Sequence, residues 1–244
     1  MLDLGANVGS FARMAAPLIG PSGRILAVEP IDEVVEALRL NIDRYERWAR
    51  ARGIAAAPIV PVHAGVGAQP DAARGSRRFV YYPRVTAMST MYPDEEDATA
   101  ATFSLVIHRP ECFSALEALA KPLARCAPAL YRAVHAAVFR RALLRPARVV
   151  ECPMLTVSDL IEQHKIAEVG LLKANVERAE WDVLLGVREE HWPRVRQVAL
   201  QVHDIAGRVG RMRRLLASKG FEVSVYKEPR FAECCLHMVY GTRP

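Results

Sequence analysis

The chain has 244 residues, is 51% hydrophobic and carries a formal net charge of +6, which predicts one domain with a full hydrophobic core. Its apolar runs fall short of the ~18 residues that span a bilayer, and its N-terminus lacks a signal-peptide pattern, so we expect no membrane as a partner. Its arginines are spread along the chain without interleaved aromatic residues, so we expect no nucleic acid as a partner either. Its five cysteines include no C-x-x-C pair, which favours a reduced, cytoplasmic protein without a structural metal.

The first predicted element is a strand that runs into a glycine turn. Met1-Leu2-Asp3-Leu4 is an apolar strand end, and Gly5-Ala6-Asn7-Val8-Gly9 leads into helix-like sequence from Ser10. The two glycines are spaced G-x-x-x-G, whereas the dinucleotide fingerprint is G-x-G-x-x-G. This order lets the backbone approach a nucleotide-like ligand. With Asp3 ahead of the turn, the pattern resembles the S-adenosylmethionine site of a methyltransferase.

The second predicted strand, over 24–29, ends in an acid. Glu29 lies 20 residues beyond Gly9, close to the separation at which a Rossmann-like unit places a carboxylate on ribose hydroxyls. The alternative is that Glu29 only caps the next helix, which apolar residues at helical spacing predict over 32–52. A third strand over 59–67 and a short β-rich segment over 78–83 follow.

The second half of the sequence predicts an insertion followed by more sheet. The stretch from 94 to about 150 is rich in Ala, Leu and Arg with proline breakers, and predicts a helical insertion within a single domain over 1–244. Such helices beside a cleft form a lid or substrate wall. The alternative is an insertion without a role in binding or catalysis. The later elements are a helix capped by Thr156 or Ser158, strands over 169–176 and 195–202, helices over 180–185 and 208–218, and a hairpin over 221–226 and 235–240.

This element order predicts an α/β protein with a doubly wound sheet, and the resemblance of the first turn to an S-adenosylmethionine site implies a Rossmann-like methyltransferase fold. We expect a seven-stranded, mainly parallel sheet with helices on both faces and a C-terminal antiparallel hairpin. The hairpin would supply the antiparallel strand of the sheet.

Four segments carry a family resemblance: LDLGANVGSF over 2–11, VEP over 28–30, LLKANVERAE over 171–180 and VHD over 202–204. Together they resemble the FkbM-type methyltransferases. These are S-adenosylmethionine-dependent enzymes, many of them O-methyltransferases, with members found beside polyketide and nonribosomal peptide machinery. The resemblance implies S-adenosylmethionine as cofactor and O-methylation of a small or carrier-tethered natural-product intermediate.

The resemblance also implies roles for single residues near the carboxyl ends of the strands, where open α/β sheets bind ligands. The methionine end of the cofactor would lie among Asp3, Gly5, Asn7 and Gly9, its ribose on Glu29, and its adenine edge along His63, Ala64 and Gly65. The floor of the cleft would be formed by Asn175 and Glu177, and its rim by His203 and Asp204.

Two positions depart from the family pattern. The family usually has an acid where this chain has Asn175, and often one where it has Gln201. Each change keeps the side-chain shape and removes the charge that strengthens a hydrogen bond to a cation; shape-preserving drift is the alternative. The first strand is also short, with only Met1 to Leu4 left to form it. We interpret this as a start codon placed too far downstream or a truncated gene copy.

Methyl transfer to a hydroxyl requires an aligned acceptor, exclusion of water and removal of a proton. Histidine has a suitable pKa for the last task, so His203 is the candidate base, with Asp204 and Glu177 as further catalytic candidates. A loop-capping role for His203 is the alternative. Three functions remain open: an O-methyltransferase, a degenerate methyltransferase-fold module that binds without turnover, and an NAD-type oxidoreductase, which the glycine spacing disfavours.

Overall fold

The computed structural model describes residues 1–68, 75–93, 144–229 and 234–243, with isolated positions between 126 and 141. The strands are β1 (Leu2–Leu4), β2 (Ile25–Glu29), β3 (Ile59–His63), β4 (Gly65–Val66), β5 (Ser76–Tyr81), β6 (Arg148–Leu155), β7 (Leu172–Ala174), β8 (Gln197–His203), β9 (Glu222–Tyr226) and β10 (Leu236–Thr242). The helices are α1 (Ser10–Ile19), α2 (Asp32–Ala51), α7 (Val157–Gln163), α8 (Glu180–Leu185) and α9 (Arg208–Ser218), with 3-10 turns η1 (Thr86–Met88) and η3 (Glu189–Arg194). Within these ranges, no helix has both the length and the apolar character needed to cross a bilayer.

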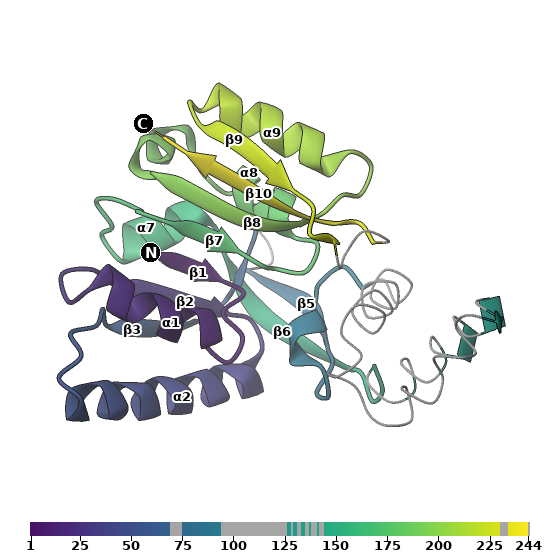
Figure 1. Cartoon of the computed structure of the whole chain (residues 1–244), viewed down its shortest axis with the longest axis horizontal. Helices are drawn as coiled ribbons and strands as arrows, with labels where there is room; N and C mark the ends of the chain where they lie inside the picture. The colour runs from purple at the N-terminus through teal and green to yellow at the C-terminus, as the bar shows by residue number, and fades with distance from the viewer. Residues whose placement is uncertain are drawn as a thin grey trace.

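The centre of the molecule is a seven-stranded sheet in the order β3-β2-β1-β7-β8-β10-β9 (Figure 1). The five strands from β3 to β8 pair in parallel, and β10 pairs antiparallel with both of its neighbours. The predicted mainly parallel sheet and its terminal hairpin are therefore confirmed. The parallel strands end at the edge that faces right in Figure 1.

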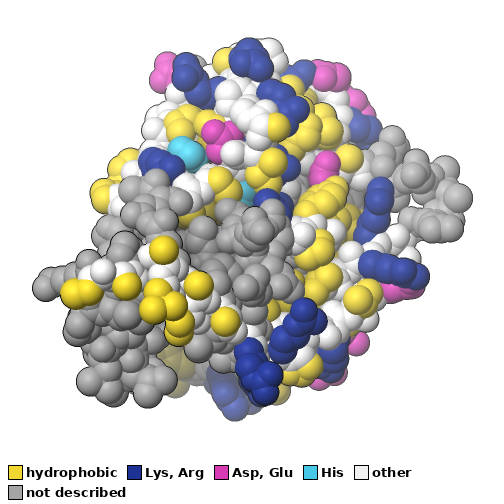
Figure 2. Space-filling view, turned by 90° about the vertical axis from the view of Figure 1, so that its right-hand side faces the viewer, with side chains coloured by type: hydrophobic (Ala, Val, Ile, Leu, Met, Phe, Trp, Pro, Cys, Tyr) yellow, Lys and Arg dark blue, Asp and Glu magenta, His cyan; other side chains and the backbone are white. Residues whose placement is uncertain are grey.

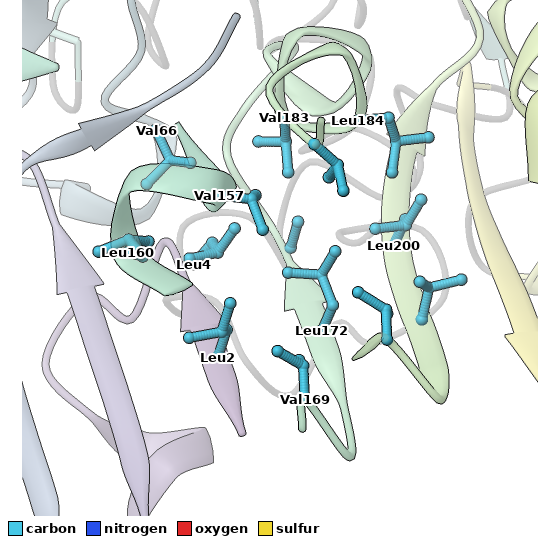
Figure 3. Packing of buried hydrophobic residues seen from close by; sticks show 14 of the residues in the cluster. Leu2, Leu4, Val66, Val157, Leu160, Val169, Leu172, Val183, Leu184 and Leu200 are labelled. Atoms are coloured by element: carbon cyan, nitrogen blue, oxygen red, sulfur yellow. The ribbon is translucent and has the colours of Figure 1, made fainter. Parts of the chain in front are cut away.

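Alternation along β2 shows that helices cover both faces of the sheet. Ile25 and Ala27 belong to a buried cluster with residues of α1 and α2, whereas Leu26 and Val28 belong to a cluster with residues of α7 and α8. Successive strand side chains point to opposite faces, so the two pairs of helices lie on opposite sides. Burial on both faces explains why these strands have continuous apolar sequences. Figure 3 shows the larger cluster.

A second, three-stranded sheet was not predicted. It has the order β4-β6-β5, with β5 antiparallel to β6. The predicted third strand over 59–67 divides at Ala64, because β3 stays in the main sheet while β4 pairs with β6. The predicted helical insertion over 94–150 overlaps β6 at 148–150, where the chain is extended. Its other positions lie outside the described residues, apart from 144–147 and the isolated ones.

Strand β1 is short but pairs along its whole length with β2 and β7. Backbone hydrogen bonds from Leu2 to Leu171 and from Leu26 to Met1 extend these ladders. Asp3 is fully buried, and its Oδ1 lies 2.8 Å from Nζ of Lys173 on β7. Nζ of Lys173 also donates to the carbonyl of Gly5 at 3.2 Å. A buried ion pair thus joins the two central strands directly below the glycine turn.

Candidate active site

Three strand-to-helix turns at the carboxyl edge of the sheet contain left-handed backbone. After β1, Asn7 has φ 49° between Gly5 and Gly9; after β7, Glu177 and Arg178 have φ 46° and 81°; after β8, Ala206 has φ 52° before Gly207. A non-glycine residue in this region costs free energy and persists only where its surroundings hold it, often at functional sites. The strained turns after β1, β7 and β8 therefore mark this edge as the candidate site.

A pocket opens at this edge. Its wall combines the turn after β1, the end of β2, the residues around β4, the segment around η1 and the turn after β7. The lining residues are Gly5, Asn7, Val28, Glu29, Pro30, Ala64, Gly65, Val66, Phe79, Thr86, Ala87, Ser89, Met91, Asn175, Val176, Glu177 and Ala179. Figure 2 views the molecule from this side, where hydrophobic side chains lie between basic ones.

Glycine is required where the backbone closes the floor of this pocket. Gly5 has φ +70°, and a Cβ on it would lie 1.8 Å from the carbonyl oxygen of Asn175. A Cβ on Gly65 would lie 2.5 Å from Sδ of Met154 and 2.7 Å from the ring of Phe79. The β1 turn therefore packs directly against the β7 turn, which keeps both parts of the pocket together.

Glu29 lies on the pocket wall with only 5% of its surface exposed. Its Oε2 accepts a hydrogen bond from the backbone N–H of Asn7 at 2.9 Å, and its Oε1 accepts one from Ile31 at 3.3 Å, just before α2. Burial raises the pKa of Glu29 from 4.5 to about 7, while these two hydrogen bonds and Lys173 lower it. Further donors, such as the hydroxyls of a ribose, would stabilise the ionised form of this carboxylate.

Two asparagines contribute amide groups to the pocket. Asn7 exchanges hydrogen bonds with the hydroxyl of Thr86, through Nδ2 at 3.1 Å and Oδ1 at 3.2 Å. Oδ1 of Asn175 is buried and accepts no hydrogen bond from the described residues. Because a buried polar atom without a partner costs free energy, this oxygen is a candidate for contact with a ligand.

Three predicted cofactor residues do not line the pocket. Asp3 lies beneath the floor, paired with Lys173. Gly9 begins α1 with φ +81°, and a Cβ on it would lie 2.6 Å from Cδ1 of Leu38. His63 lies behind the wall, with Nε2 3.1 Å from the carbonyl oxygen of Pro30. These residues shape the turns around the pocket, and direct cofactor contact by any of them stays a prediction.

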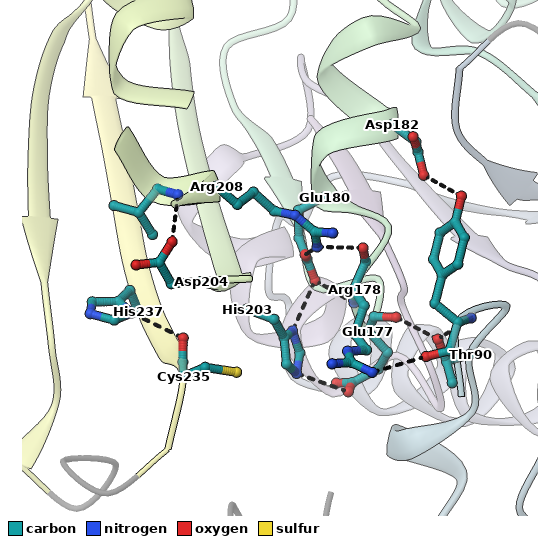
Figure 4. Close-up of polar contacts among 12 residues, drawn as sticks. Thr90, Glu177, Arg178, Glu180, Asp182, His203, Asp204, Arg208, Cys235 and His237 are labelled. Atoms are coloured by element: carbon teal, nitrogen blue, oxygen red, sulfur yellow. Dashed lines mark hydrogen bonds and ion pairs between the residues drawn. The ribbon is translucent and has the colours of Figure 1, made fainter. Parts of the chain in front are cut away.

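The predicted catalytic residues fall into one polar cluster beside the pocket, with the exception of Asp204 (Figure 4). His203 ends β8 and is 5% exposed. Its Nε2 lies 3.7 Å from Oε2 of Glu177, which lines the pocket, and its Nδ1 lies 3.3 Å from Oε1 of Glu180. The imidazole is thus placed between two carboxylates, one at the pocket and one buried.

Asp204 and Gln201 have other surroundings. Oδ1 of Asp204 accepts a hydrogen bond from the backbone N–H of Val209 at 3.0 Å, so its carboxylate holds the first turn of α9. Gln201 is half-buried on β8 opposite Met238 of β10, and it is not among the residues that line the pocket. Across the described part of the chain, no group of three His, Cys, Asp or Glu side chains is arranged to hold a metal ion.

The structure adds residues that sequence reasoning missed. Glu180 is fully buried and contacts His203, and Arg208 pairs with Glu180 from the start of α9. Thr86 and Phe79 complete the pocket wall. One feature of the sequence could have indicated a role for Glu180, because it is a charged residue within a buried stretch. No sequence pattern indicated that Arg208 or η1 lies close to the segment over 171–180.

Comparison with known proteins identifies the family. A family model described as the methyltransferase FkbM domain matches residues 3–223. The chain belongs to the FkbM methyltransferase family. Its fold and its methyltransferase class agree with the resemblance drawn from the four sequence segments.

Three relatives match all or most of the chain. The 31-O-demethyl-FK506 methyltransferase FkbM of Streptomyces tacrolimicus is 32% identical over all of this chain and 80% of its own length. The AMB antimetabolite synthetase AmbE of Pseudomonas aeruginosa is 31% identical, again over the whole chain, but the match covers only 10% of that protein. The methyltransferase sdnD of Sordaria araneosa is 24% identical over 92% of this chain and 74% of its own length.

A solved structure shares the fold. The crystal structure of a methyltransferase FkbM from Methylobacillus flagellatus matches 98% of this chain and 42% of its own, with a TM-score of 0.50 and 12% sequence identity.

Proposed function

We propose that the chain is an S-adenosylmethionine-dependent O-methyltransferase whose acceptor is a hydroxyl of a small or carrier-tethered natural-product intermediate. One observation carries the proposal: Glu177, on the pocket wall, lies against Nε2 of His203. This places a proton-accepting pair beside the space where a cofactor and an acceptor would meet. The natural-product names of the relatives support the acceptor class.

The residues of the pocket fit the proposed cofactor. Glu29 offers a buried carboxylate for two ribose hydroxyls, and Oδ1 of Asn175 is a buried acceptor without a partner among the described residues. Gly5 and Gly65 let the backbone of the pocket wall pack closely against Asn175, Met154 and Phe79, where a Cβ would clash. Ala64, Val66 and Phe79 add an apolar wall of the kind that an adenine ring contacts.

S-adenosylmethionine, when bound, supplies a methyl group on a positively charged sulfur, and transfer to a hydroxyl oxygen leaves the electron pair on sulfur and releases the hydroxyl proton. Glu177 would accept that proton at its pocket-facing carboxylate. The proton would then pass to Nε2 of His203, 3.7 Å away. The left-handed turn at Glu177 and Arg178 holds this carboxylate toward the pocket.

Domain organisation belongs to the same proposal. We propose that residues 1–244 form one methyltransferase domain; the helical insertion or lid expected over 94–150 lies largely outside the described residues. The AmbE match supports a carrier-tethered acceptor, because a synthetase of that kind contains a segment similar to this whole chain.

Two measurements test the function. Calorimetric titration should show binding of S-adenosylmethionine and none of NAD; the reverse result would favour an oxidoreductase. Transfer of labelled methyl from S-adenosylmethionine should then be measured with hydroxy acids offered free and as carrier-protein thioesters. Label in either acceptor supports the enzyme and tells the two acceptor forms apart.

A module that binds without turnover is the second candidate. The amides at Asn175 and Gln201 favour it, since each replaces an acid of the family pattern. Tight cofactor binding without label in any hydroxyl acceptor would support this candidate and contradict the transferase.

A further inference from the structure

We propose that Glu180 is a positioning residue that keeps a proton on Nδ1 of His203 and thereby leaves Nε2 facing Glu177 and the pocket. The meaning of this role for catalysis rests on the proposed function, but the placement of the proton does not. Glu180 lies in the first turn of α8, on the Nδ1 side of the His203 ring, and Glu177 lies on the Nε2 side (Figure 4).

The carboxylate of Glu180 is fully buried and contacts two hydrogen-bond donors and one ring nitrogen of His203. Its Oε1 accepts a hydrogen bond from the backbone N–H of Arg178 at 2.8 Å and faces Nδ1 of His203 at 3.3 Å. Its Oε2 accepts one from Nη1 of Arg208 at 3.3 Å. Nη1 of Arg208 also donates to the carbonyl of Arg178 at 2.6 Å, which fixes the guanidinium in place.

These contacts favour the ionised form of the Glu180 carboxylate. A buried carboxylate is costly unless it is paired and hydrogen-bonded, and here a guanidinium and a backbone N–H both stabilise the ionised form. An ionised carboxylate only accepts hydrogen bonds. The ring nitrogen that faces it, Nδ1 of His203, must therefore be the donor.

The consequence for the other ring nitrogen follows directly. A neutral imidazole with a proton on Nδ1 has its lone pair on Nε2. Nε2 lies 3.7 Å from Oε2 of Glu177, beyond hydrogen-bonding distance, so this carboxylate does not require a proton on Nε2 as Glu180 does on Nδ1. Nε2 is therefore the atom able to receive a proton from the pocket. Once Nε2 is protonated, the imidazolium is stabilised by both Glu177 and Glu180. Among the residues that the structure describes, Arg178 and Arg208 are the other charged residues in contact with Glu180.

The competing view gives Glu180 a purely structural role. Its contacts join the β7 turn, α8, β8 and the start of α9, so a loss of stability alone would be consistent with either view. The position of the proton on His203 separates them, because a structural tie does not require a particular tautomer.

The deciding experiment is nuclear magnetic resonance of the full chain with ¹⁵N-labelled histidine and no cofactor. His203 is assigned by comparison with His203→Gln, and spectra are recorded at a pH above the titration of the ring. We expect Nδ1 protonated and Nε2 unprotonated. A neutral ring with its proton on Nε2 would overturn the proposal. Because this measurement needs no activity, it stands even if methyl transfer is not found.

Kinetics supply the second test. Glu180→Gln presents an amide N–H₂ group or a weaker acceptor to Nδ1, so kcat should fall at least about tenfold while KM for S-adenosylmethionine changes less than about twofold. The matched control is Glu168→Gln, which removes an exposed carboxylate paired with Arg196 and should leave kcat unchanged. A folded Glu180→Gln protein with the parent's kcat would contradict the proposal. If this variant does not fold, the tautomer of the parent decides.

Discussion

The buried carboxylate of Glu29 makes the folding free energy depend on pH, and Glu29→Gln tests this. In the unfolded chain the pKa of this group is 4.5, and in the folded protein burial raises it to about 7. The folded protein therefore holds the proton more tightly. The contribution of Glu29 to stability is fully present below pH 4.5 and is lost as the pH rises through about 7.

The size of this effect follows from the shift. Each pKa unit corresponds to about 1.36 kcal/mol, so a rise from 4.5 to about 7 gives a loss of about 3 kcal/mol in the free energy of unfolding. A glutamine keeps the shape of the side chain and does not titrate. Relative to the parent, Glu29→Gln should gain about this much stability between about pH 4 and pH 8.

Urea unfolding of both proteins without cofactor, at steps of about one pH unit, measures the difference directly. The parent and the variant share all other titrating groups, so these cancel in the comparison. A difference that stays constant across the range would refute the reasoning, because it would mean that Glu29 titrates alike in the folded and unfolded chains.

Cofactor binding provides a second test of the same carboxylate. Ribose hydroxyls should favour the ionised form, so affinity of the parent for S-adenosylmethionine should rise with pH through about 7, and Glu29→Gln should bind at least about tenfold more weakly.

Three further predictions concern the strands around the pocket. Gly5→Ala would put a Cβ 1.8 Å from the carbonyl oxygen of Asn175, so it should lower the free energy of unfolding by more than about 2 kcal/mol; Gly170→Ala, which meets no atom within 4 Å, is the control and should be near neutral. Lys173→Met leaves the buried carboxylate of Asp3 unpaired and should cost about 3–5 kcal/mol in urea unfolding, and a small loss would mean that the ion pair contributes little. Asn175→Asp restores the acid of the family pattern and should tighten calorimetric binding of S-adenosylmethionine about fivefold, while unchanged affinity would show that the amide is native to the site.

The sequence by itself determined the first half of the sheet and the family. Glycines at 5 and 9, an acid at 29 and apolar runs between turns are local features, and each depends only on residues close together in the chain. They sufficed to predict the βαβ order, the helix that became α2, and the terminal hairpin. The family resemblance of the four segments also implied that Gly5, Asn7, Glu29 and Glu177 lie at one edge, where the ends of parallel strands meet.

Only the tertiary structure decided which groups meet. The strand that divides at Ala64 and the sheet of β4, β6 and β5 depend on pairing between segments far apart in the chain, such as Gly65 with Met154 and Tyr81 with Arg148, which no local pattern encodes. The same holds for Asp3, whose carboxylate turned to Lys173 on β7, and for Glu180, whose partners come from β8 and α9. Local spacing limits which side chains reach an edge of the sheet, but the charge and hydrogen bonding of a buried group depend on neighbours that packing alone brings together.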